Sequence, residues 1–207
     1  MKDASAPRRR TGRPLSFDRE QALQRAMLLF WRYGYDSTSL AQLTSAMGIS
    51  PPSLYAAFGD KKQLFQEAVG RYSAGLAGWM DSVDAAATAR DAVQSLLEGA
   101  AIGFTGPDTP AGCLIISAAT NCSAASADVQ AELAAIRRET EGRVRDRIQR
   151  DVDAGLLPRD ADAPALAAMY MTLVQGMSNQ ARDGAPREKL LALGRAAMRA
   201  WPADAPA

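Results

Sequence analysis

The sequence predicts an all-α protein in which a small N-terminal domain precedes a larger helical domain. Of the 207 residues, 42 are Ala, whereas Val and Ile together number only 13. Ala is the best helix former and β-branched residues favour strands, so the composition favours helices. After residue 18, apolar residues recur every three or four positions in each segment, which is the spacing of one helical face. We therefore expect about nine helices.

Four helices are predicted near the N-terminus, each preceded by a side chain that can accept a hydrogen bond from the first helical turn. These capping residues are Asp18, Ser39, Ser50 and Asp60. Gly34 and Gly48 permit the backbone conformation that ends a helix. Pro51 occupies a first-turn position, where its missing N–H costs nothing. The third helix, 51–57, is about two turns long, and the fourth continues toward Trp79.

Every segment beyond residue 80 also has a helical apolar pattern. The predicted helices are 89–104, 112–122, 126–154, 162–181 and 186–200. Stretches rich in Gly, Pro and Asp separate them at 106–112, 155–160 and 183–186. Within 126–154, Val129, Leu133 and Ile136 begin a stripe that Val144 and Ile148 continue. Such a stripe predicts a long helix that packs one face against a core.

The residue types that are missing exclude several classes of function. The chain has no histidine, so it lacks a Ser-His-Asp triad, a Cys-His pair and a His-ligated metal. Its two cysteines, Cys113 and Cys122, are too few for a four-thiolate zinc site or a disulfide framework. No phosphate-binding GxxxxGK loop or clustered acid pair is present. We therefore expect no enzyme activity, no metal and no cofactor.

The sequence also lacks the features of membrane and secreted proteins. No stretch approaches the ~18 uninterrupted apolar residues of a membrane span. The N-terminus lacks the apolar region of a signal peptide. Two cysteines without a disulfide framework suit a reducing compartment. A soluble cytoplasmic protein without a membrane partner is expected.

The near-zero net charge conceals an uneven distribution. The whole chain carries +1, but residues 1–70 carry +4 and residues 71–207 carry −3. Four arginines crowd into six positions within 1–15, a segment with no apolar period that we expect to be a flexible basic arm. A basic N-terminal third on an almost neutral chain indicates a polyanionic partner for that part alone.

Residues 17–65 contain three consecutive sequence segments that together form one motif. Helix 1 ends in LFWRYGY, TSLAQLTSAMGIS forms helix 2 and the turn, and PPSLYAAFGDKKQLF follows. Two short helices around Gly48 form a helix-turn-helix pattern, and the whole segment resembles the DNA-binding domain of the TetR family of bacterial transcriptional regulators. The resemblance implies a helix-turn-helix DNA-binding domain over 16–62 and an effector-binding and dimerisation domain over 63–207. It also implies a repressor that a small-molecule effector releases from a palindromic operator.

The resemblance, the outward face of the third predicted helix and the basic arm together give candidate DNA contacts. Tyr55 and Lys61 would hold phosphates, and the helix cap Ser39 would offer donors to another phosphate. Ser53 would read a base edge, and Pro51, Pro52 or Ala56 would touch a thymine methyl group. Arg9, Arg10 and Arg13 of the arm would enter a neighbouring minor groove. The alternatives are that Tyr55 packs against helix 1, that the lysines are a solvated helix start, and that the arm is a solubilising tail.

The resemblance also places a ligand pocket and a dimer interface in the second domain. The candidate pocket residues are Trp79, Leu97, Phe104, Cys113, Ile116, Asn121, Met169 and Tyr170. The candidate interface residues are Leu173, Met177, Leu190, Met198 and Trp201. The last two helices hold more apolar residues than one face can bury within a subunit, which favours a homodimer. For each pocket residue the alternative is ordinary core packing, and for the interface it is a monomer.

Cys113 suggests a further alternative. It follows Gly112 at a predicted helix N-terminus, where the helix dipole lowers the pKa of a thiol. A protein of the same fold would then sense oxidants or electrophiles, although a small buried apolar residue is the simpler interpretation. Cys113 and Cys122 lie on opposite sides of the predicted helix and cannot pair within it. The remaining alternative is a helical ligand-binding protein that does not bind DNA.

Overall fold

The computed structural model describes residues 17–120 and 122–202, so the predicted basic arm and Asn121 lie outside the described residues. The described residues form nine α-helices and no strand, which confirms the all-α prediction. The helices are α1 (Arg19–Tyr33), α2 (Leu40–Met47), α3 (Pro51–Phe58), α4 (Lys61–Asp84), α5 (Ala89–Gly103), α6 (Leu114–Ser117), α7 (Ala127–Asp153), α8 (Ala163–Arg182) and α9 (Arg187–Met198).

Local capping explains where the first helices begin. The side chain of Asp18 accepts a hydrogen bond from the backbone N–H of Gln21 at 3.0 Å. Ser39 exchanges two hydrogen bonds with Gln42, and Asp60 does the same with Gln63. Each exchange satisfies donors that a helix leaves without partners in its first turn. These predicted helix starts are confirmed.

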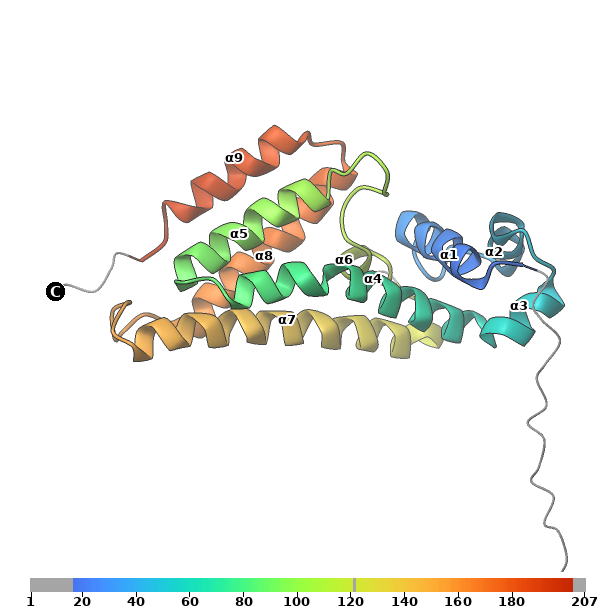
Figure 1. The fold of residues 1–207 in the computed structure, drawn as a ribbon, viewed down its shortest axis with the longest axis horizontal. Coiled ribbons are helices and arrows are strands. Elements are labelled where there is room, and N and C mark those ends of the chain that lie inside the picture. The colour runs from blue at the N-terminus through green and yellow to red at the C-terminus, as the bar shows by residue number, and fades with distance from the viewer. Residues whose placement is uncertain (1–16, 121, 203–207) are drawn as a thin grey trace, which may run out of the picture.

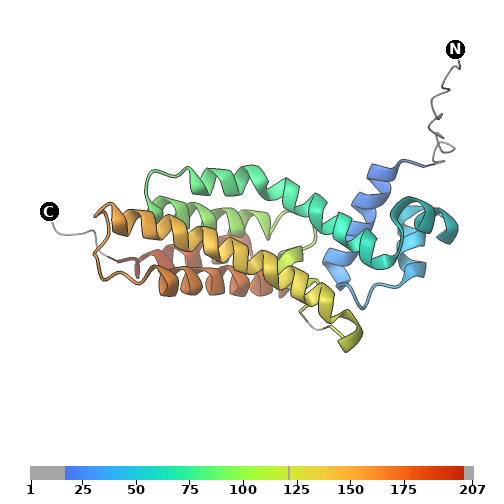
Figure 2. The same ribbon diagram turned by 90° about the horizontal axis from the view of Figure 1, so that it is seen from below.

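The helices form two groups joined by α4. Figure 1 shows α1, α2 and α3 gathered at one end, while α5, α8 and α9 lie at the other. The helix α4, 24 residues long, leaves the first group and continues into the second. The longest helix, α7, runs for 27 residues beside α4 and α8 (Figure 2). A continuous apolar core passes through both groups.

Aromatic side chains connect the small group to α4. The ring centroid of Phe65 lies 5.0 Å from that of Phe30 and 5.0 Å from that of Tyr35. About two turns further along α4, Tyr72 meets Trp31 edge-on with centroids 4.9 Å apart. Edge-to-face contacts of this kind add to the stabilisation from burial. They fix the orientation of α1 on α4.

The predicted helix 112–122 is wrong. Only Leu114–Ser117 is helical, followed by a turn and a short 3-10 helix, Ala124–Ser126. The carbonyl of Ala118 accepts the backbone N–H of Tyr35 at 2.7 Å. The carboxylate of Asp36 accepts the backbone N–H of Ser123 and the hydroxyl of Ser126, each at 2.6 Å. These long-range bonds outweigh the helix propensity of an alanine-rich segment.

No helix within residues 17–120 and 122–202 is both long enough and apolar enough to span a bilayer.

Candidate functional site

The helix α3 presents one face to solvent and anchors the other in the core. Leu54 and Phe58 are buried, whereas Pro51, Pro52 and Ala56 are exposed. Tyr55 is 51% exposed, a large value for an aromatic side chain. Ser53 is half-buried, and its hydroxyl lies 2.9 Å from that of Ser50. The arrangement offers a narrow helix face of the size that enters a DNA major groove.

The cap of α2 is a second candidate contact for DNA. Ser39 is exposed, and its side-chain oxygen accepts the backbone N–H of Gln42 at 3.2 Å. Its own backbone N–H donates to the Gln42 side chain at 2.8 Å. This exchange leaves the hydroxyl hydrogen of Ser39 able to donate to an anion near the positive end of α2.

The two lysines that open α4 both have partners within the chain. The ammonium of Lys61 lies 4.5 Å from the ring centroid of Tyr35 and 3.5 Å from the carbonyl of Asp36. Burial lowers the pKa of Lys61. Lys62 forms an ion pair with Asp128 at 2.6 Å and approaches Glu132 at 3.4 Å. Neither lysine is therefore simply a solvated helix start, and the half-buried ammonium of Lys61 keeps N–H donors that could hold a phosphate.

Two groups that position α3 were not found by sequence reasoning. Arg19 donates to the carbonyl of Ala57 at 3.1 Å, pairs with Glu67 at 2.7 Å and lies over the ring of Phe58. Asp36, through its bonds to the segment after α6, ties the α1–α2 loop to the second group of helices. All these partners are 38 or more residues away in the sequence, so no local pattern indicates the contacts.

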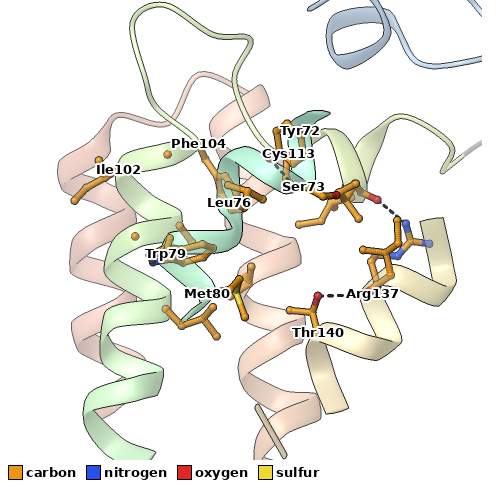
Figure 3. Close-up of a pocket in the computed structure, with 18 of the residues that line it drawn as sticks. Tyr72, Ser73, Leu76, Trp79, Met80, Ile102, Phe104, Cys113, Arg137 and Thr140 are labelled. Carbon is orange, nitrogen blue, oxygen red and sulfur yellow. Dashed lines mark hydrogen bonds between the residues drawn. The ribbon is translucent and has the colours of Figure 1, made fainter. Parts of the chain in front are cut away.

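A partly open cavity of about 890 Å³ lies between α4, α5, α6, α7 and α8, with Trp31 of α1 also in its wall (Figure 3). Of the predicted pocket residues, Trp79, Phe104, Cys113 and Ile116 line it together, although they come from separate parts of the chain. Sequence reasoning missed other lining residues, among them Leu76, Met80, Ile136, Arg137, Thr140 and Met171. The apolar residues among them have the spacing of ordinary core positions. A volume of this size suits a small-molecule ligand.

Three of the predicted pocket residues lie elsewhere. Leu97 is buried close to Gly194 of α9, while its neighbour Leu96 lines the cavity. Met169 is 38% exposed on the surface of α8, and Tyr170 is fully buried with its ring 5.5 Å from that of Trp201. Adjacent helical residues point about 100° apart. The predictions identified two helices that do line the cavity, but they chose residues on the sides of those helices that face away from it.

Most of the predicted interface residues lie in the core of the single chain. Met177, Leu190, Met198 and Trp201 are all buried within the single chain, and Leu173 is half-buried. The chain's own core therefore accommodates the apolar residues that were expected to exceed its capacity. The exposed side of α8 instead carries small residues and one methionine, namely Ala165, Ala168, Met169, Thr172 and Gly176.

The expected low pKa of Cys113 is wrong. The thiol is 7% exposed and accepts a hydrogen bond from the hydroxyl of Tyr72 at 3.2 Å. Burial raises the pKa of Cys113, and it raises that of Tyr72 as well. The helix that follows Cys113 has only four residues, so its dipole is small. The buried thiol is a weakly reactive group at neutral pH.

This buried pair makes the protein sensitive to alkali. In the unfolded chain a cysteine loses its proton near pH 8.5 and a tyrosine near pH 10. The folded chain retains both protons to higher pH, so the stabilisation is complete below about pH 8.5 and is lost as the pH rises through these values. The free energy of unfolding, measured with urea, should therefore fall between about pH 9 and 11.

The variant Tyr72→Phe should show a shallower fall over this range, because the phenol that must ionise on unfolding is gone. Tyr33→Phe provides the control, because Tyr33 is 51% exposed. It should keep the pH dependence of the parent protein. Equal slopes for all three proteins would contradict the assignment.

Comparisons with known proteins agree with this geometry. Residues 22–68 match the family model of bacterial regulatory proteins of the tetR family, and residues 89–189 match a tetracyclin repressor-like C-terminal domain. The HTH-type transcriptional repressor ComR of Escherichia coli (strain K12) is 36% identical over 193 residues, which are 92% of each chain. The repressor BdcR of the same organism is 31% identical over 189 residues, 87% of each chain.

A solved structure extends the comparison. A cysteine mutant of the TetR family transcriptional regulator CifR, complexed with 26 bp double-strand operator DNA, is 46% identical to this chain with a TM-score of 0.87. The match covers 92% of this chain and 100% of the other. Family models, curated relatives and a solved structure thus agree over both groups of helices, and the chain belongs to the TetR family of bacterial transcriptional regulators.

Proposed function

We propose that the protein is a cytoplasmic repressor that binds a palindromic operator as a homodimer and is released from it by a small-molecule effector. The observation that carries the proposal is the solvent face of α3, where Tyr55 and three small or cyclic residues project from a helix anchored by Leu54 and Phe58. The named repressor function of ComR and BdcR supports it, as does the operator DNA bound by CifR.

In this proposal α3 lies in the major groove. Tyr55, Ser39 and Lys61 hold phosphates on either side, and Ser53 approaches a base edge. Few side chains on α3 are able to read bases, so arginines of the N-terminal arm, Arg9, Arg10 and Arg13, would supply contacts in the adjoining minor groove. The arm lies outside the described residues, and this part of the proposal depends on the sequence alone.

A dimer is needed because one helix-turn-helix unit grips a half-site weakly. The exposed small residues of α8, Ala168, Thr172 and Gly176, allow the backbone of a second copy to approach closely. Met169 and the half-buried Leu173 add apolar surface beside them. We therefore place the dimer interface on this side of α8 and on the neighbouring side of α9.

The cavity supplies the means of release. It is bounded in part by Cys113, Ile115 and Ile116, and the segment that they begin bonds to the α1–α2 loop at Tyr35 and Asp36. A ligand that binds better to one placement of this segment shifts the population of orientations of α3. A dimer whose two recognition helices are displaced no longer matches both half-sites at once.

Selection from random double-stranded DNA tests the proposal. The purified protein should enrich an inverted repeat whose half-sites are centred about 10 bp, or a multiple of that, apart. Light scattering should give about twice the 22.0 kDa mass of one chain. Enrichment of no sequence, or of a single half-site bound by a monomer, would contradict the proposal and favour a helical protein that does not act on DNA.

A further inference from the structure

We propose that the effector is a small carboxylate with an apolar or aromatic body, and that Arg137 is the residue that holds its carboxylate. The inference rests on the proposed function, since it names the class of molecule that occupies the regulator's cavity. The observations that carry it are the apolar wall of the cavity, a half-buried arginine without an acidic partner, and the ion pairs that already occupy the other lining arginine, Arg143.

The wall of the cavity suits an apolar body. Leu76, Trp79 and Met80 approach from α4, and Phe104 approaches from the end of α5 (Figure 3). Ile116 closes the side formed by α6. Burying apolar ligand surface against such side chains contributes about 25 cal/mol for each Å². The apolar side chains of the wall therefore provide affinity for an apolar molecule. Selectivity between molecules with similar apolar bodies must come from the few polar groups of the cavity.

Arg137 is the polar group that stands out. It lines the cavity from α7 and is half-buried, and its Nη1 atom donates to the carbonyl of Ile115 at 2.7 Å (Figure 3). The guanidinium forms no ion pair with any described Asp or Glu. Burial lowers the pKa of Arg137, because desolvation disfavours its charged form. A carboxylate that bonds the remaining N–H groups in pairs would offset this cost.

The other charged groups around the cavity do not compete for this role. Arg143 is already paired with Asp84 and lies 3.6 Å from Asp81. Glu139 and Asp108 line the cavity only as exposed residues. Cys113 and Tyr72 keep their protons and bond to each other, because burial raises the pKa of both. The charges of Glu139 and Asp108 are screened by solvent, whereas Arg137 supplies an unpaired, half-buried positive charge, which favours an anion over a cation.

The position of Arg137 also connects binding to release. Its partner Ile115 belongs to α6, and three residues later the carbonyl of Ala118 accepts the backbone N–H of Tyr35. A carboxylate that draws the guanidinium toward the cavity weakens its bond to Ile115. The segment that holds the α1–α2 loop then loses one of its anchors to α7.

Matched probes test the ligand class without knowledge of the natural effector. We would titrate full-length protein with phenylbutyrate and phenylbutanamide, and with octanoate and octanamide, by isothermal titration calorimetry at pH 7. Each pair has the same body and differs in charge. At least one carboxylate should bind tenfold or more tightly than its amide. Equal or tighter binding of the amides, or no binding by either carboxylate at millimolar concentration, would overturn the proposal.

Variants then identify the residue. Arg137→Met should remove the preference for the carboxylate while leaving the affinity for the amide unchanged within about twofold, and Arg137→Lys should retain part of the preference. Arg138→Met is the control, because Arg138 is the exposed next residue on α7 and does not line the cavity. A preference that survives in Arg137→Met would overturn the assignment, provided that its melting temperature shows a folded protein.

The readouts separate this inference from the proposed function. Calorimetry needs no DNA, so a carboxylate preference that depends on Arg137 upholds the inference even where operator release fails. Operator release by the amides as strongly as by the carboxylates would overturn the inference and uphold the regulator.

Discussion

Replacing Arg147 with alanine is expected to lower the free energy of unfolding by about 3–5 kcal/mol, because it leaves a buried carboxylate without its partner. The side chains of Arg147 and Asp151 are only 6% and 7% exposed, and they pair at 2.5 Å on successive turns of α7. Arg147 also donates to the carbonyls of Ala86 and Ala87, at 3.1 and 3.0 Å.

These bonds give hydrogen-bond partners to two carbonyl groups in the turn between α4 and α5. Asp151 accepts the backbone N–H of Ala89, the first residue of α5, at 2.6 Å. The pair therefore holds the turn after α4, the start of α5 and the C-terminal end of α7 in one network. Buried backbone groups that lose such partners keep their full desolvation cost.

The neighbouring residue Arg145 provides a matched control. It is exposed on the same helix and pairs only with the adjacent Asp146. Arg145→Ala should change the free energy of unfolding by less than about 0.5 kcal/mol. Urea unfolding followed by circular dichroism measures both variants. A difference of less than about 1 kcal/mol between them would contradict the role assigned to the network.

A double replacement refines the test. Arg147→Met with Asp151→Leu removes both charges and leaves no isolated ion, so it should recover part of the stability lost in Arg147→Ala. Recovery should be incomplete, because the carbonyls of Ala86 and Ala87 and the N–H of Ala89 still lose their partners. Full recovery would show that the pair contributes little beyond cancelling its own charges.

Such long-range contacts mark the limit of what the sequence could predict. The capping residues Asp18, Ser39 and Asp60 act on backbone groups three residues away, so their pattern is visible in the chain itself. The early helix starts followed from them. The short α6 did not, because its end is set by Tyr35 and Asp36, which are more than 80 residues distant.

In the functional site, too, the sequence predicted the features that one helix determines and missed those that depend on packing between helices. The alternation of buried Leu54 and Phe58 with exposed Tyr55 and Ala56 is a property of one helix, and the motif indicated it. The cavity depends on how six helices rotate about their axes, and a one-residue error turned Leu96 into Leu97. Arg137 gave no local signal, because its significance comes from what surrounds it in space.

The largest effect on DNA is expected from Tyr55→Phe, which should weaken operator binding about tenfold to hundredfold. The change removes one hydroxyl from a side chain that is 51% exposed, so the fold should be unaffected. A hydrogen bond to a charged group contributes about 1.5–3 kcal/mol when it is well formed. Both subunits of a dimer lose it at once, so even a partly solvated bond gives an effect of this size.

The salt dependence distinguishes a neutral hydroxyl from a charged contact. Replacing a lysine that neutralises a phosphate reduces the slope of log affinity against log salt concentration, whereas Tyr55→Phe should lower the affinity at every salt concentration with the slope unchanged. Tyr33→Phe is the matched control, since Tyr33 is also 51% exposed but lies at the end of α1 rather than on α3. Fluorescence anisotropy with the selected operator measures all three proteins. An affinity of Tyr55→Phe within twofold of the parent protein would show that α3 meets the phosphates without this hydroxyl, and the orientation proposed for α3 in the groove would then be wrong.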